Sequence, residues 1–306
     1  MGHDLDTTWE AVAPRGRRYE VAGRRLWLHR AGTGGPAVVF LPGASAIGLD
    51  HLNVAELAGE FATSVVYDRA GTGWSDPVEL PRTCAEVAGE LRDLLRVAEV
   101  PGPYVLVPHS LGGLYARRFA QLFPDEVAGM VGLEPLCEMW DDHMPEQQHL
   151  AHSEIDRAAV PEIPAEQLEF VRELFETKLA DWPAEVREPL IDWHLANRSF
   201  RVGLVEGGNL RDLVTEIHAA GRVPDLPLIT FTGFAFDPGM QQVFGYSDEF
   251  LQRLNDAKRT LFDALAASVT DGEHRVLDNA SHSWLHIDEP EAVLQGIRDL
   301  LDKVGP

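Results

Sequence analysis

Residues 104–115 read YVLVPHSLGGLY, and this stretch decides the fold. Its first half is apolar and rich in valine, which predicts a buried strand, and the spacing of apolar residues after the glycine pair predicts a helix. Ser110 then lies at the apex of a sharp turn that lifts its hydroxyl clear of the sheet. We expect Gly112 and Gly113 here because strand and helix backbones approach so closely that a Cβ would clash.

The chain on either side of this turn alternates between apolar strands and amphipathic helices. Expected strands are 37–41, 64–67, 104–108, 127–133, 227–232 and 272–277, and expected helices include 83–97, 248–267 and 291–301. Residues 17–31 add two short antiparallel strands that meet at a turn. This alternation predicts an α/β fold with a doubly wound, mainly parallel sheet.

Residues 136–224 break the alternation, since they are acidic, rich in helical patterns and rich in large aromatic residues. Helical windows lie at 164–179 and 183–196. We therefore expect a core domain of residues 17–135 and 225–303 with an inserted helical cap subdomain of residues 136–224. Most of its aromatic side chains should pack in its own core, and some could line a pocket.

Composition excludes several classes of partner. The 306 residues are 45% hydrophobic, carry a net charge of −23 and contain no apolar run long enough to span a membrane. Such a charge argues against nucleic acid and anionic membranes as partners. Residues 1–10 are polar, so we expect no secretory signal, and Cys84 and Cys137 are expected to be reduced thiols. We expect a cytoplasmic protein that acts on a small molecule.

The turn at Ser110 resembles the nucleophile elbow, Gly-x-Ser-x-Gly, of the α/β-hydrolase superfamily. Residues 67–75, YDRAGTGWS, resemble a loop of many hydrolases in that superfamily, and residues 136–224 resemble its inserted helical cap. Pro108 replaces the first glycine of the motif. Because proline fixes φ and lacks an N–H, this departure affects the geometry of the elbow rather than the identity of the nucleophile. The alternative is that Ser110 only caps the following helix.

A nucleophilic serine needs a general base and a group that orients the base. Residues 280–282 and 288–290, ASH and DEP, resemble the superfamily's Ser-Gly-His and Asp-x-Pro ending, which implies that His282 is the base. His286 is the rival, although it fits a helix-entry turn better.

Three other histidines are given no chemistry. We expect His109 to point away from the nucleophile and to pack. His29 and His51 carry no motif and are expected at the surface or in loops.

Two carboxylates are candidates for the acid that orients the base. In the superfamily it follows either the strand before the cap, where this chain has Glu134, or the strand after the cap, where it has Asp237. We favour Glu134, because a carboxylate at the end of an apolar strand needs a partner such as a histidine N–H. The other carboxylate would then stabilise a turn, and for Asp237 beside Pro238 an Asx-turn is plausible.

The resemblance also implies an oxyanion hole made by the backbone N–H groups of Ala44 and Leu111. Asp68 and Arg69 are expected to pair with each other or with loop backbone. The sequence thus predicts a serine hydrolase that cleaves a small, mostly apolar ester, lactone or thioester without metal or cofactor. The alternatives are an amidase or aminopeptidase, a C–C hydrolase or perhydrolase with the same triad, and a non-catalytic binding protein.

Overall fold

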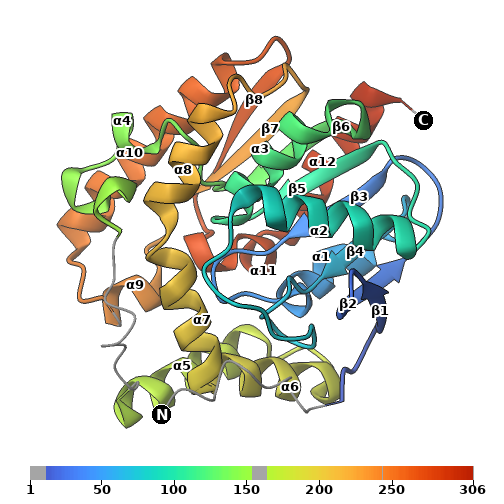
Figure 1. Cartoon of the computed structure of the whole chain (residues 1–306). Coiled ribbons are helices and arrows are strands. Elements are labelled where there is room, and N and C mark those ends of the chain that lie inside the picture. The colour runs from blue at the N-terminus through green and yellow to red at the C-terminus, as the bar shows by residue number, and fades with distance from the viewer. Residues whose placement is uncertain (1–11, 154–163, 243, 306) are drawn as a thin grey trace.

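A computed structural model describes residues 12–153, 164–242 and 244–305 (Figure 1). The first ten residues, discussed above for a signal, lie outside this range. Within it, eight strands form one sheet in the order β1-β2-β4-β3-β5-β6-β7-β8. Their bounds are β1 Arg17–Val21, β2 Arg24–Ala31, β3 Ala37–Leu41, β4 Ser64–Tyr67, β5 Tyr104–Pro108, β6 Val127–Leu133, β7 Leu228–Gly233 and β8 Gly272–Leu277.

The sheet is mainly parallel, as expected. Strand β1 pairs antiparallel with β2 and β2 antiparallel with β4, and every later pair from β4 across to β8 is parallel. Because side chains alternate along a strand, Val39 and Leu41 of β3 enter one hydrophobic core while Val38 and Phe40 enter the other. Residues 37–41 are all buried, which explains their continuous apolar run.

Helices cover both faces of the sheet (Figure 1). Helices α2 (Cys84–Val97), α3 (Gly112–Leu122) and α10 (Asp248–Ala267) supply one core, and α1 (Leu52–Ala58) and α12 (Pro290–Val304) supply the other. Helix α2 begins as predicted, with a capping box between Thr83 and Glu86.

The helical insertion lies between β6 and β7. It contains α4 (Trp140–His143), α5 (Ala165–Lys178), α6 (Ala184–Leu195), α7 (Asn197–Gly207) and α8 (Leu210–Ala219). Helices α5, α6 and α7 lie at the bottom of Figure 1, and α8 packs against α2 and α3. The remaining short helices are η1 Gly48–His51, η2 Pro124–Glu126, η3 Glu146–Gln148, η4 Leu150–His152, α9 Pro238–Gln242, η6 His282–Trp284 and α11 Leu285–Asp288.

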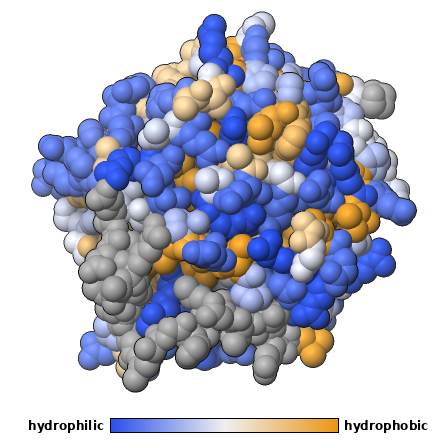
Figure 2. Space-filling view, in the orientation of Figure 1, coloured by the Kyte–Doolittle hydropathy of each residue, from blue (hydrophilic) through white to orange (hydrophobic). Residues whose placement is uncertain are grey.

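One face of the molecule is largely polar. On the face drawn in Figure 2, hydrophilic residues predominate and hydrophobic residues form only small patches. No helix in the described part of the chain is both long and apolar enough to cross a membrane. Cys84 and Cys137 are both buried free thiols.

Candidate active site

The turn between β5 and α3 is held in a strained conformation. Ser110 has a backbone φ of +49°, a value that residues other than glycine rarely adopt. Its N–H donates to the carbonyl of Leu133 at 3.3 Å, and its own carbonyl accepts from the N–H of Leu136 at 2.8 Å. Such strain persists only where the surroundings hold it, and here the end of β6 does so.

The glycine pair is required for close packing, as predicted, although the contact is with neighbouring segments rather than with β5. A Cβ on Gly112 would lie 2.1 Å from the carbonyl oxygen of Leu41, at the end of β3. A Cβ on Gly113 would lie 2.3 Å from the carbonyl oxygen of Leu136, just after β6. Both glycines therefore let α3 begin between these two segments.

Pro108 fits the end of β5 because its missing N–H falls in a gap of the sheet. It pairs in register with Leu41 of β3. On the other side, the β5–β6 pairing ends at Leu106 and resumes as a single bridge between His109 and Leu133. Proline at this position therefore costs the sheet little.

Three residues far apart in sequence meet at the carboxyl ends of the strands. The Oγ of Ser110 lies 3.2 Å from Nε2 of His282, and Nδ1 of His282 lies 2.6 Å from Oε2 of Glu134. Glu134 follows β6 and has φ of +44°, and His282 begins η6 after β8. The structure thus brings together the predicted nucleophile, base and preferred acid in one hydrogen-bonded chain.

The carboxylate of Glu134 is almost completely buried, and besides its bond to His282 it has an ionic partner in Lys258. Nζ of Lys258 lies 2.9 and 3.0 Å from its two oxygens, and the N–H of Gly233 donates to Oε1 at 2.7 Å. Burial alone would raise the pKa of Glu134, but the charge of Lys258 and the bond to His282 outweigh it and bring the pKa to about 2. Glu134 is therefore ionised at any pH near neutrality.

Sequence reasoning missed Lys258, although a signal was present. Leu251, Leu254, Leu261 and Leu265 mark the buried face of α10, and Lys258 lies on that face, four residues after Leu254. A lysine there must bury its ammonium group and needs an anion nearby. Which anion it meets depends on β6, which is distant in sequence.

We expect Lys258→Met to lower the free energy of unfolding by about 3–5 kcal/mol, because it leaves the buried Glu134 carboxylate without the ammonium group that balances its charge. Urea denaturation at pH 7 measures this. The matched control is Lys303→Met, which removes the exposed pair with Asp271 and should cost less than about 1 kcal/mol. Equal losses in the two variants would contradict a stabilising role for the buried pair.

The same pair sets a pH dependence of stability. The pKa of Glu134 is about 2 in the folded chain against an ordinary 4.5, so its stabilisation is complete above pH 4.5 and is lost as the pH falls towards 2. Lys258→Met raises this folded-state pKa, so its urea midpoint should fall less between pH 4.5 and pH 3 than that of the wild type.

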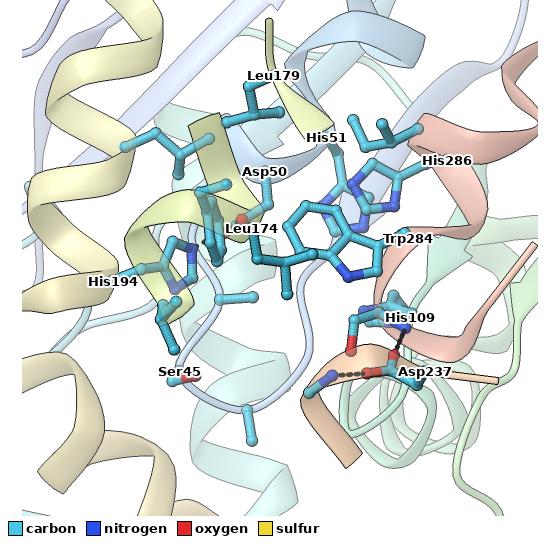
Figure 3. Close-up of a pocket in the computed structure, with 18 of the residues that line it drawn as sticks. Ser45, Asp50, His51, His109, Leu174, Leu179, His194, Asp237, Trp284 and His286 are labelled. Atoms are coloured by element: carbon cyan, nitrogen blue, oxygen red, sulfur yellow. Dashed lines mark hydrogen bonds and ion pairs between the residues drawn. The ribbon is translucent and has the colours of Figure 1, made fainter. Parts of the chain in front are cut away.

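Asp237, the second candidate acid, is engaged elsewhere. Its Oδ1 accepts from the N–H groups of Gly239 (2.9 Å) and Met240 (3.2 Å), and its Oδ2 accepts from the N–H of Ser283 (2.9 Å). It therefore caps α9 and fixes the residue next to His282 (Figure 3). Among the described residues, no hydrogen bond joins its carboxylate to the His282 ring.

The remaining histidines differ partly from expectation. The Nε2–H of His109 donates to the carbonyl of His282 at 2.9 Å, so this ring packs as expected and supports the loop of the base. His286 lies in α11 and is buried. The expectation that His29 and His51 lie at the surface or in loops is wrong. His29 is a half-buried residue of β2, and His51 has no exposed surface because it packs against Phe40 and His286.

The loop after β3 is held by charged residues. The guanidinium of Arg69 donates to the carbonyls of Pro42 and Gly43, each at 2.8 Å, so Arg69 binds loop backbone as expected. Glu206 of α7 pairs with Arg69 at 3.0 Å and accepts from the N–H of Ser45 at 3.0 Å. Asp68 likewise binds backbone, at the N–H groups of residues 48 and 74. Among the hydrogen bonds of the described residues, none uses the N–H of Ala44 or Leu111.

A cavity of about 220 Å³ lies between the helical insertion and the ends of the strands (Figure 3). Ser110 and His282 are not among the residues that line this cavity, but their neighbours in sequence, His109 and Ser283, line it together with Ala44. Helix α5 supplies much of its apolar wall, including Phe170 and Leu174. Phe170 of the insertion lines the cavity, whereas Trp193 is buried in the same core cluster as Val38 and Phe40 of β3 rather than in a core of the insertion's own.

An eight-stranded sheet in this order, a serine at a strained strand–helix turn and a helical insertion after β6 define an α/β hydrolase fold. The model of the alpha/beta hydrolase family matches residues 38–295, and the chain belongs to this family.

Curated relatives match only part of the chain. YqjL of Bacillus subtilis is 33% identical over 129 residues, which are 41% of this chain and 50% of that protein. YbdG of the same organism is 28% identical over 137 residues, which are 43% of this chain and 42% of that protein. Both are described as uncharacterized. The chain thus spans half or less of the length of these relatives.

Solved structures match the whole fold at low identity. Cfl2 from Burkholderia cenocepacia superposes with a TM-score of 0.68 at 18% identity, covering 96% of this chain and 99% of that one. A putative epoxide hydrolase from Pseudomonas aeruginosa gives 0.64 at 18% identity, covering 94% and 95%. A thermophilic esterase from Thermogutta terrifontis gives 0.59 at 20% identity, covering 95% and 100%. These likenesses establish the fold.

Proposed function

We propose that this protein is a serine hydrolase that cleaves small, mostly apolar carboxylic esters, lactones or thioesters through an acyl-enzyme. The observation that carries this proposal is the continuous hydrogen-bonded chain from Ser110 through His282 to Glu134. Family membership supports a hydrolase, and a serine at the elbow favours an acyl-enzyme.

Each residue of the triad has one role. Ser110 Oγ attacks the carbonyl carbon while Nε2 of His282 takes its proton, and the same proton then passes to the leaving oxygen or sulfur. Water attacks the acyl-enzyme with His282 again as base, and the serine is restored. Glu134 holds the imidazole in the required tautomer and compensates its charge, and its low pKa keeps it ionised throughout.

The N–H groups of Ala44 and Leu111 are the proposed oxyanion donors. In a trans peptide the carbonyl and the next N–H point in opposite directions. Because Arg69 binds the carbonyl of Gly43, it fixes the direction of the Ala44 N–H. Glu206 in turn fixes Arg69 and Ser45, so a residue of the helical insertion orients the proposed oxyanion hole.

We expect Glu206→Gln to lower kcat about tenfold with little change in KM, because a misdirected donor weakens binding of the transition state more than binding of the substrate. Steady-state kinetics on a p-nitrophenyl ester measure both constants. The control is Glu216→Gln. Glu216 is another carboxylate of the insertion that accepts from backbone N–H groups of the core domain, but these belong to residues 84 and 85 of α2 and not to the loop after β3. A rise in KM with unchanged kcat would contradict this role.

The insertion, residues 136–224, acts in this proposal as a cap that shapes the acyl pocket. Besides Glu206, Trp193 supports this role, since its indole N–H donates to the carbonyl of Ser45 at 2.9 Å. The mostly apolar lining of the cavity favours an apolar acyl group.

Substrate class is tested by comparing p-nitrophenyl esters of two to eight carbons with thioesters, lactones and aminoacyl anilides. We expect turnover of esters, with anilides at least about a hundredfold slower in kcat/KM. Faster turnover of anilides would replace the proposal with an amidase or aminopeptidase. Binding of these compounds without turnover would replace it with a binding protein.

A further inference from the structure

Lys258 is a buried charged residue to which the proposed mechanism gives no role. Its Nζ lies 2.9 and 3.0 Å from the two oxygens of Glu134 and 3.4 Å from the carbonyl oxygen of Gly233. The side chain of Lys258 is only 5% exposed and that of Glu134 only 1%. Because an ammonium group has three N–H donors and no acceptor, three acceptors around one nitrogen fit the charged form of lysine. A positive charge therefore lies next to the proposed acid of the triad.

The contacts of Glu134 bring this charge close to the proposed base. Oε2 of Glu134 contacts both Nζ of Lys258, at 3.0 Å, and Nδ1 of His282, at 2.6 Å. Two groups that contact the same oxygen atom lie within the roughly 4–6 Å over which one charge changes the protonation of another. Lys258 therefore acts on His282 as well as on Glu134, although it does not contact the imidazole ring.

The charge of Lys258 changes what a proton on His282 costs. Beside a buried carboxylate alone, an imidazolium would cancel a negative charge and would be strongly favoured. With Lys258 present, the carboxylate is already neutralised, so the same proton adds a buried positive charge with no anion of its own. The pKa of Glu134 reflects the same interactions, since Lys258 and His282 together bring it to about 2 against the effect of burial.

Other titratable groups around His282 do not take over this role. His109, from the turn after β5, and His286, from α11, are kept neutral by burial, which lowers the pKa of both and brings that of His109 to about 3. Asp237 and Asp288 lie beside the loop of His282, but each accepts from a backbone N–H of a residue next to it in sequence. Their contacts with this loop are therefore with its backbone and not with the ring.

We propose that Lys258 is a positioning residue that keeps the His282–Glu134 pair from taking up an extra proton under mildly acidic conditions. His282 then stays neutral, and able to accept the proton of Ser110, to lower pH than it would beside a carboxylate alone. The effect on catalysis rests on the proposed function, whereas the effect on proton uptake by the pair does not. A merely structural lysine would affect activity by the same factor at every pH.

Proton uptake is measured by NMR titration of the full chain labelled with ¹⁵N at histidine, with the His282 signals assigned by their loss in His282→Gln. We expect their titration midpoint to lie at least about one pH unit higher in Lys258→Met than in the wild type. If Lys258→Met does not fold, Lys258→Gln gives the same comparison, because its amide still donates to Glu134 but carries no charge. A midpoint in the folded variant that equals or falls below that of the wild type would overturn the proposal.

The matched control is Lys178→Met. Lys178 of α5 pairs with Asp288, which accepts from the N–H of Ser281 at 3.3 Å. This variant removes a cation from the same loop without removing a contact of Glu134, so the His282 midpoint should move less than in Lys258→Met. A shift as large as that of Lys258→Met would mean that any cation near the loop has this effect, and would contradict the assignment to Lys258.

The consequence for catalysis is measured separately, as kcat/KM for p-nitrophenyl butyrate between pH 5 and pH 8. From pH 8 to pH 5 the value for Lys258→Met should fall about tenfold more than that of the wild type, as a shift of one pH unit in the acid limb predicts. An equal loss at every pH would leave Lys258 with a structural role only.

The two measurements separate this inference from the proposed function. If the midpoint of His282 shifts as expected but the wild type hydrolyses no ester, the proposed function fails and the role of Lys258 in proton uptake stands. If the wild type hydrolyses esters and both the midpoint and the pH profile are unchanged in Lys258→Met, the inference fails and the hydrolase stands.

Discussion

Replacement of Ser110 by alanine is expected to lower kcat/KM for p-nitrophenyl butyrate by about four to six orders of magnitude. The variant has no nucleophile for the acyl-enzyme, so only the oxyanion donors and substrate binding remain. Alanine at this position removes one oxygen and keeps the strained backbone, which Leu133 and Leu136 hold through main-chain bonds. The fold should therefore be unchanged by circular dichroism.

The control for this experiment is Ser283→Ala. This residue follows His282, and the contact it makes with Asp237 uses its backbone N–H. Loss of its hydroxyl should leave kcat/KM within about tenfold of the wild type. If Ser110→Ala also stays within tenfold, the hydrolysis occurs elsewhere or by another mechanism.

Replacement of the triad acid should have the second largest effect. Glu134→Gln is expected to lower kcat by about three to four orders of magnitude, because an uncharged amide neither fixes the tautomer of His282 nor compensates its positive charge. Asp237→Asn should lower kcat by no more than about tenfold, since an amide oxygen still accepts from some of the backbone N–H groups that Asp237 binds. Stopped-time assays with a sensitive ester at saturating concentration measure the kcat of each variant.

A loss of folding in Glu134→Gln must be separated from a loss of catalysis. The substitution leaves the ammonium of Lys258 buried without an anion. The double variant Glu134→Gln/Lys258→Met removes that charge, so it should recover stability in urea while its kcat stays low. If Asp237→Asn instead falls by three orders and Glu134→Gln stays near wild type, the acid is Asp237.

The fold and the main contacts of the site could be predicted from the sequence because both depend on the buried parallel strands. Buried parallel strands require continuous apolar runs, so residues 37–41, 64–67 and 104–108 were recognisable at once. Ser110 and Glu134 follow neighbouring parallel strands, β5 and β6, whose carboxyl ends lie at one edge of the sheet. Their proximity follows from the topology.

Other parts of the site could not be predicted because each depends on a partner that local patterns do not identify. Lys258 meets Glu134, and Glu206 meets Arg69, across 124 and 137 residues of sequence. Nothing around His51 in the sequence indicates burial, because the rings that pack against it come from the turn after β5 and from α11. That Pro108 fits the end of β5 could not be predicted either, because the fit depends on a gap in the pairing of β5 with β6.

Labelling by a fluorophosphonate, read by intact-protein and peptide mass spectrometry, tests the central claim most directly. The account predicts one adduct per chain, located on the peptide that contains Ser110, abolished in Ser110→Ala and slowed at least about a hundredfold in His282→Ala. Absence of any adduct on folded wild-type protein, or an adduct on another residue that persists in Ser110→Ala, would contradict it.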